Sequence, residues 1–213
     1  MKNALILLIT IFSITLASAQ QDQSQGYIQT AYNAIKAKKY PEAIENYSNA
    51  IRAYSEYAPA HYGRGLAYYS SGNMTMAKQD FETTIRLEPT YFEAYYALGM
   101  IELRNGNFEK SIELFDKCLT ISNAFPEAYY ARATSWYNME EYDKALVDYS
   151  KTIQLQPDYA LAYYGRGVTH KQQKRNGRAS EDLKQYKKLA GDRDNMQREV
   201  DRLIEEAENP RED

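Results

Sequence analysis

A small residue followed four positions later by a bulky apolar one recurs along this chain every 34 residues. The pairs are Ala43/Tyr47, Ala77/Phe81, Ser111/Phe115, Ala145/Tyr149 and Ala179/Leu183. A fixed period of this length is typical of a supersecondary unit that stacks on copies of itself. It divides the chain into five blocks, 24–57, 58–91, 92–125, 126–159 and 160–193. Since each block of such a stack contacts only its neighbours, we expect function on an extended surface and not in a closed pocket.

Further positions of the blocks predict two helices in each, joined by a tight turn. The eighth position is always small: Ala31, Gly65, Gly99, Ala133 and Gly167. With the small residue at position twenty, it allows two helices to cross closely, and bulky residues at positions seventeen and twenty-four fill the space beside them. Gly72 and Gly106 fall where the first helix of a block must stop, because glycine adopts positive φ at little cost. Pro89 and Pro157 mark the ends of two second helices.

These residues resemble the tetratricopeptide repeat (TPR) family, whose units are 34-residue helix–turn–helix pairs. The resemblance covers almost the whole chain after its first residues, with the repeats spanning 27–191. It implies an all-α fold, a right-handed solenoid of about five repeats with a C-terminal capping helix. Among relatives of this kind, the chain looks most like exported bacterial TPR proteins.

The first residues predict export. Lys2 precedes an apolar run from Ala4 to Ala17, and Ala17-Ser18-Ala19 ends it, so residues 1–19 have the pattern of a secretory signal peptide. The alternative is an uncleaved anchor, but the run is shorter than the roughly 20 residues that a membrane-spanning helix needs. We therefore expect a periplasmic or secreted protein with no membrane span after cleavage. Residues 20–26 form a short polar stretch, after which the first helix either begins late or acts as an N-terminal cap.

Residues 192–213 predict a capping helix and an acidic tail. Asp194 and Gln197 have capping-box spacing, and a helix is expected from about Asn195 to Glu208. Its apolar residues form one stripe: Met196, Val200, Leu203, Ile204 and Ala207. The stripe either covers the end of block five or docks a partner. Block five has nine Lys/Arg against three Asp/Glu, and residues 194–213 have eight Asp/Glu against three Arg, so the two segments are expected to screen each other.

Charged residues stand at two block positions where apolar ones are expected. The seventh and twenty-third positions hold Arg64 with Asp80, Arg132 with Asp148, and Arg166 with Asp182. Block three has Leu98 with Leu114 instead. Because charge occurs with charge and leucine with leucine, we expect these positions to face each other, with Arg forking onto Asp.

The resemblance also implies a binding surface. In the family, positions five, nine and twelve of the first helices look into a concave groove, and here they are rich in tyrosine. The candidate groove residues are Tyr32, Tyr62, Tyr69, Tyr96, Met100, Tyr130, Tyr137 and Tyr164. A tyrosine joins a large apolar ring to a polar tip, which suits an extended or helical peptide. The alternative is that some of these rings only pack between blocks. The family's carboxylate clamp is not expected, because tyrosine occupies the matching positions.

Catalysis, metal binding and cofactor binding have no motif in this sequence. The chain has two histidines at unrelated block positions and one cysteine, Cys118, which is expected to be a packed small residue. A net charge of −3 and export both argue against nucleic acid as a partner. The sequence therefore favours a non-catalytic scaffold that binds a protein or peptide. Two alternatives stay open: a glycan- or small-ligand-binding protein that uses stacked tyrosines, and a structural protein that self-associates end to end.

Overall fold

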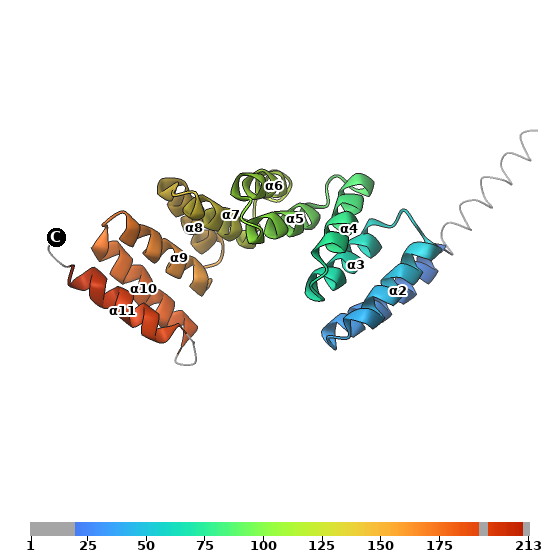
Figure 1. The fold of residues 1–213 in the computed structure, drawn as a ribbon, viewed down its shortest axis with the longest axis horizontal. Coiled ribbons are helices and arrows are strands. Elements are labelled where there is room, and N and C mark those ends of the chain that lie inside the picture. The colour runs from blue at the N-terminus through green and yellow to red at the C-terminus, as the bar shows by residue number, and fades with distance from the viewer. Residues whose placement is uncertain (1–19, 192–195, 211–213) are drawn as a thin grey trace, which may run out of the picture. The chain divides into compact units, whose positions relative to one another are not determined.

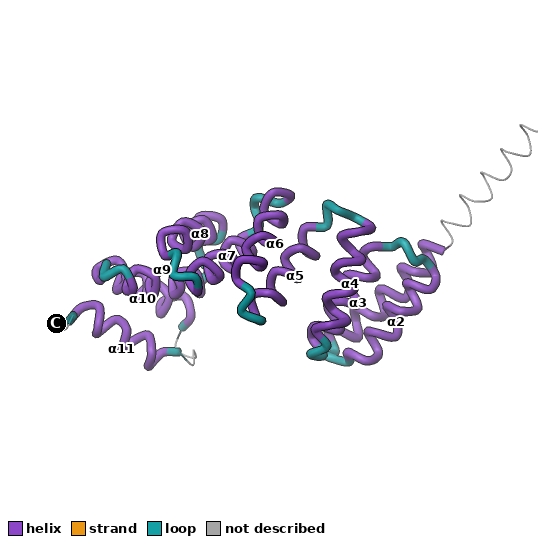
Figure 2. Tube along the Cα trace, turned by 45° about the horizontal axis from the view of Figure 1, so that its top comes forward, coloured by secondary structure: helices purple, strands orange, loops and turns teal. Residues whose placement is uncertain are grey.

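The computed structural model describes residues 20–191 and 196–210, and these residues form helices joined by short turns (Figures 1 and 2). The signal-peptide pattern and Asp194 lie outside the described residues. The helices are 20–36, α2 (Tyr40–Ala53), α3 (Ala58–Ser70), α4 (Met74–Leu87), α5 (Phe92–Arg104), α6 (Phe108–Ile121), α7 (Pro126–Asn138), α8 (Tyr142–Leu155), α9 (Ala160–Gln172), α10 (Asn176–Ala190) and α11 (Gln197–Glu208). Each 34-residue block therefore contributes two helices, as the period predicts.

The chain divides into two units, one ending at Ala94 and the other beginning at Tyr95, within α5. The first unit is built from the helix 20–36 and α2 to α4. That helix already includes residues 20–26, so the expectation that it begins late is wrong. The reason is that four of the seven residues are Gln, a good helix former, and no proline interrupts the segment. The second unit contains α6 to α11.

A left-handed turn residue recurs at the fifteenth position of every block. The residues are Lys38, Gly72, Gly106, Glu140 and Lys174, with φ between 57° and 87°. Each follows the last turn of a first helix and leads into the next helix. Glycine adopts this conformation freely, whereas the lysines and the glutamate do so at a cost. The turn is therefore set by the packing of the two helices and not by glycine alone.

The core ring at position twenty-four takes one of two packing arrangements, which differ in the glycine that the ring contacts. A Cβ added at Gly99 would lie 2.5 Å from Phe115 in the same block, so this ring presses on the eighth position. A Cβ added at Gly165 would lie 2.5 Å from Tyr149 of the preceding block, so this ring presses on the sixth position of the next block. The two tyrosines contact a glycine of the next block, Tyr47 with Gly63 and Tyr149 with Gly165. The two phenylalanines contact a glycine of their own block, Phe81 with Gly65 and Phe115 with Gly99.

Helix α11 covers the end of block five and lies beside α10 in Figure 1. Its Val200 and Leu203 are buried against Leu183 and Tyr186 of α10. Ion pairs link the basic block to the acidic helix: Lys171 Nζ–Glu206 Oε2 at 2.5 Å, Lys184 Nζ–Glu208 Oε1 at 2.6 Å and Lys187 Nζ–Asp201 Oδ1 at 2.6 Å. In the 34-residue register, α11 falls on the first helix of a sixth block. It is thus half a repeat, with a charged outer face and no second helix in the described residues.

Candidate functional site

The predicted tyrosines at position five form part of a repeated aromatic cluster. In the second unit, the ring of Tyr96 lies 5.9 Å from that of Phe115 and 5.0 Å from that of Phe125, measured between ring centroids. The ring of Tyr130 lies 5.8 Å from Tyr149 and 5.2 Å from Tyr159. Each of these tyrosines is therefore held between two other rings, at separations typical of favourable aromatic pairs.

The fifth block builds its cluster from different residues. Leu183 replaces the ring at position twenty-four, and Tyr186, three residues later, supplies a ring 5.3 Å from Tyr164. Tyr164 also packs against the cluster that contains Val200 and Leu203 of α11. Burial raises the pKa of its hydroxyl, and Glu199 of α11 raises it further. The capping helix thus approaches the tyrosine surface at its C-terminal end.

The tyrosines of the second unit lie close enough to influence one another. Burial raises the pKa of Tyr130, the Thr134 hydroxyl lowers it in part, and the Tyr164 hydroxyl makes a smaller raising contribution. Burial likewise raises the pKa of Tyr159, with further contributions from Tyr130, Tyr96 and Glu127. Tyr96, Tyr130 and Tyr164 stand at the same position of three successive first helices and so share one surface of the repeats, and Glu127 lies in the first turn of α7.

We call this surface the tyrosine face and define it by Tyr96, Met100, Tyr130, Tyr137 and Tyr164, all half-buried. Tyr137 extends the face along α7, where its ring lies 5.7 Å from Tyr142 and its hydroxyl accepts a hydrogen bond from Gln172 Nε2 at 3.3 Å.

The predicted residues of the first unit are arranged in the same way. The ring of Tyr62 lies 5.7 Å from Phe81 and 4.9 Å from Tyr91, and burial raises the pKa of Tyr91 to about 12. Tyr69 is half-buried, whereas Tyr32 is 48% exposed and has the Lys36 ammonium above its ring. The first helices thus present tyrosines in both units, but most of the rings also take part in packing between helices.

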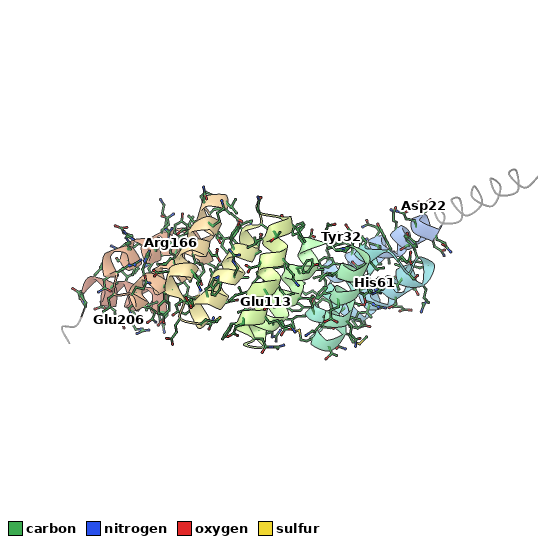
Figure 3. All side chains as sticks on the ribbon, turned by 90° about the horizontal axis from the view of Figure 1, so that it is seen from above. Asp22, Tyr32, His61, Glu113, Arg166 and Glu206 are labelled. Atoms are coloured by element: carbon green, nitrogen blue, oxygen red, sulfur yellow. The ribbon has the colours of Figure 1, made fainter. Side chains whose placement is uncertain are left out.

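The predicted charge pairs are bidentate in all three blocks. Arg132 donates from Nε to Asp148 Oδ2 and from Nη2 to Asp148 Oδ1, both at 2.7 Å. Equivalent bonds of 2.7–2.8 Å join Arg64 to Asp80 and Arg166 to Asp182 (Arg166 is labelled in Figure 3). Each aspartate is buried, whereas the arginine side chains keep about a fifth of their surface exposed. These pairs occupy the arginines, so they join helices and do not form an open row of cations.

Each arginine also has a further partner that was not predicted from the sequence. Nη1, the arginine nitrogen that is not bonded to the aspartate, donates to the residue at position twenty-five of the preceding block, on that block's second helix. The bonds run from Arg64 to Ser48 Oγ (3.2 Å), from Arg132 to Asp116 Oδ1 (2.5 Å) and from Arg166 to Ser150 Oγ (3.1 Å). Each arginine therefore fastens three helices from two successive blocks. The hydroxyl or carboxyl group recurring sixteen residues before each arginine was the available signal.

Asp80 has an additional neighbour. His61 Nδ1 lies 3.7 Å from Asp80 Oδ1, and His61 Nε2 is 2.9 Å from the Ser55 carbonyl oxygen. Burial raises the pKa of the Asp80 carboxyl, but the hydrogen bonds from Arg64 and the nearby His61 ring together lower it more, so the pKa lies below its usual value. Asp80 therefore stays ionised at neutral pH.

Glu102 is a buried carboxylate that was not predicted from the sequence. It is 3% exposed, and its carboxylate accepts a hydrogen bond from Asn107 Nδ2 at 2.7 Å and faces Lys110 Nζ at 3.5 Å. It stands at the position that holds Tyr68, Trp136 and His170 in other blocks. Both of these partners come from the following turn and the start of α6 in block three, so Glu102 joins the two helices of that block.

Metal sites, reactive cysteines and membrane spans were also sought among the described residues. No group of three His, Cys, Asp or Glu side chains in residues 20–191 and 196–210 is arranged to hold a metal ion. Cys118 is fully buried. None of the described helices combines the length and apolar character that crossing a membrane requires.

Fold and site together define a helical repeat protein that presents surfaces from successive helix pairs. The chain belongs to the tetratricopeptide repeat family. The model described as "TPR repeat" matches residues 35–72 and 135–174, and the one described as "Tetratricopeptide repeat" matches 58–91 and 92–125. Proteins of this family generally act as scaffolds for protein interactions. A search of the curated proteins gives no match.

Solved structures show the same fold at low sequence identity. The type IV pilus biogenesis factor PilW has a TM-score of 0.79 at 17% identity, over 87% of this chain and 86% of that chain. YrrB, described as a TPR protein with an unusual peptide-binding site, has a TM-score of 0.66 at 22% identity, over 86% and 90%. MamA from Desulfovibrio magneticus RS-1 has a TM-score of 0.67 at 18% identity, over 85% and 96%.

Proposed function

We propose that this protein is an exported, non-catalytic scaffold that binds a partner protein or peptide on its tyrosine face. The observation that carries the proposal is the row of Tyr96, Tyr130 and Tyr164 on successive first helices, each half-buried and held by neighbouring rings. Rings fixed in this way lose little freedom when a partner binds, and tyrosine is enriched at the energetic centres of interfaces.

The chemistry of the face favours a partner with apolar and basic side chains. The rings and Met100 offer apolar area, and Glu127 lies in the first turn of α7, three residues before Tyr130. A segment that places lysine or arginine beside Glu127 and apolar side chains over the rings would be complementary to this surface. YrrB, which has the same fold and is described as a TPR protein with an unusual peptide-binding site, is compatible with such a role for this chain.

The test separates binding from packing by removing hydroxyl groups while keeping rings. Tyr130→Phe/Tyr164→Phe leaves the aromatic cluster in place, and Tyr129→Phe/Tyr163→Phe makes the same chemical change at the neighbouring positions, whose hydroxyls donate to the Asn123 and Pro157 carbonyls. We expect a partner captured from an envelope extract, then purified, to bind the first variant roughly tenfold more weakly than the wild type in calorimetry. The control should bind normally.

A second variant probes the apolar part of the same face. Met100→Glu places a charge among the rings and should weaken the same partner more than the hydroxyl changes do. Circular dichroism must first show that each variant is folded. Wild-type affinity in both Tyr130→Phe/Tyr164→Phe and Met100→Glu would refute binding at this face.

Export is tested independently of binding. The support for it is the sequence pattern of residues 1–19 alone. Expression of the full chain in a bacterium should yield an extracytoplasmic protein whose first residue is Gln20, as found by N-terminal sequencing. A chain lacking residues 2–19 should stay in the cytoplasm. A full-length product that stays bound to the membrane with residues 1–19 still attached would contradict signal-peptide cleavage.

A further inference from the structure

An open hollow of about 1070 Å³ lies between α8 and α10 in the second unit. No residue of the tyrosine face lines it. The first helices contribute to it through block positions four, seven and eleven, whereas the tyrosine face uses five, nine and twelve. At 3.6 residues per turn these two sets are about a third of a turn apart. The hollow is therefore a separate surface of the same repeats.

Most of the charge in the hollow is already compensated. Nine charged side chains line it, five basic and four acidic. Six of them form three pairs: Arg132 with Asp148, Arg166 with Asp182, and Arg175 with Asp143 at 3.7 Å. Arg132 and Arg166 also lie over the rings of Tyr129 and Tyr163. These arginines are fixed parts of the walls and have little capacity for a ligand.

Two cationic side chains on opposite walls of the hollow do not belong to these three pairs. Lys151 of α8 donates a hydrogen bond to the neutral amide oxygen of Gln154 at 3.1 Å, and Arg178 of α10 is exposed. Within the described residues neither has an ion-pair partner. Glu181 is the remaining acidic group, so the hollow carries one more positive than negative charge. An anionic group placed between the walls would face two cations that the fold itself does not neutralise.

The hollow also has an apolar surface. Val147 of α8 is 67% exposed, and it lines the hollow beside the buried Leu146. A free inorganic anion would leave Val147 in water. A ligand that combines carboxylates with an apolar side chain would use both features of the walls.

We propose that this hollow binds an acidic segment of a second partner protein, with its carboxylates on Lys151 and Arg178 and an apolar side chain over Val147. The two surfaces of the second unit then have opposite preferences, basic and apolar segments on the tyrosine face and acidic and apolar segments in the hollow. A chain with both surfaces can hold two different proteins at once.

His170 provides a reporter inside the hollow. It is 7% exposed, it lines the hollow, and its Nδ1 has no hydrogen-bond partner among the described residues. Burial lowers its pKa; Asp182 raises it, and Arg166, Arg175 and Arg178 lower it. A carboxylate bound near these arginines should raise the pKa of His170, because a nearby negative charge favours the imidazolium form. His61, in block two, is the other histidine of the chain and serves as an internal reference.

The experiment measures both histidine pKa values by NMR, with and without a blocked peptide of alternating Glu and Leu. A peptide with Gln in place of Glu is the control ligand. We expect the Glu peptide to raise the pKa of His170, to leave that of His61 unchanged, and to bind less well as salt is added. Lys151→Glu/Arg178→Glu should weaken binding at least roughly tenfold. Lys117→Glu/Lys188→Glu, which makes an equal charge change outside the hollow, should bind as the wild type does.

Three results would overturn the proposal. The first is an unchanged His170 pKa at saturating Glu peptide, and the second is equal affinity in the two charge-reversed variants. The third is a response to inorganic phosphate equal to that to the peptide, which would mark a simple anion site. Tyr130→Phe/Tyr164→Phe should bind the Glu peptide normally, so failure of the tyrosine face and failure of the hollow are distinguishable.

Discussion

Blocks three and four of the second unit build the same helix pair with different residues at three points. Block three has Leu98 and Leu114 where block four has Arg132 and Asp148. The core ring of block three is Phe115, which presses on Gly99, whereas that of block four is Tyr149, which presses on Gly165 of the following block. The turn residue is Gly106 in block three and Glu140 in block four. The comparison shows that the repeat fixes how the two helices of a block pack, and that different sets of side chains can produce the same packing.

The largest expected effect comes from breaking the charge pair of block four. Arg132→Ala leaves Asp148, 3% exposed, without its bidentate partner, and should lower the free energy of unfolding by roughly 3–5 kcal/mol. Urea denaturation followed by circular dichroism measures it. A midpoint equal to that of the wild type would show that the pair does not stabilise the block.

A second variant gives block four the two leucines that block three has at these positions. Arg132→Leu/Asp148→Leu removes both charges together, so it should be far more stable than Arg132→Ala and close to the wild type, because no buried charge is stranded. Asp116→Ala is the matched control, since it removes only the exposed third partner and should cost less than about 1 kcal/mol.

The next effect tests the two ring arrangements. Gly165→Ala adds a methyl group into the Tyr149 ring and should cost roughly 1–3 kcal/mol. The triple change Ala133→Gly/Tyr149→Phe/Gly165→Ala installs the arrangement of block three and should recover most of that loss. Thermal unfolding of the single and triple variants decides the matter. A triple variant less stable than Gly165→Ala would mean that the ring's direction is set elsewhere.

The smallest effect concerns the turn. Glu140→Gly should raise the free energy of unfolding by up to about 1 kcal/mol, because glycine adopts φ near 61° without steric cost and Glu140 is exposed. Gly106→Ala in block three should have the opposite sign. If both changes destabilise in chemical denaturation, the turn conformation is not the source of the difference between the blocks.

Much of the candidate surface was accessible from sequence because the repeats can be compared with one another. The joint occurrence of arginine and aspartate at positions seven and twenty-three predicted the three bidentate pairs. The tyrosines of position five were assigned to a binding face, yet the structure also places Tyr96 and Tyr130 between pairs of rings. That packing depends on position twenty-four, which lies on the second helix, and on position thirty-four, which lies in the turn after it, so a pattern within one helix does not reveal it.

The sequence by itself determined the repeat length, the helix pairs, the turns and the class of protein, because these follow from a periodic arrangement of small, bulky and polar residues. Only the tertiary structure decided which glycine each core ring presses on, which helix supplies the third partner of each arginine, and where Lys151, Arg178 and Val147 form a hollow. These features join residues from different blocks, and the distance between blocks is set by side-chain packing that no local pattern specifies.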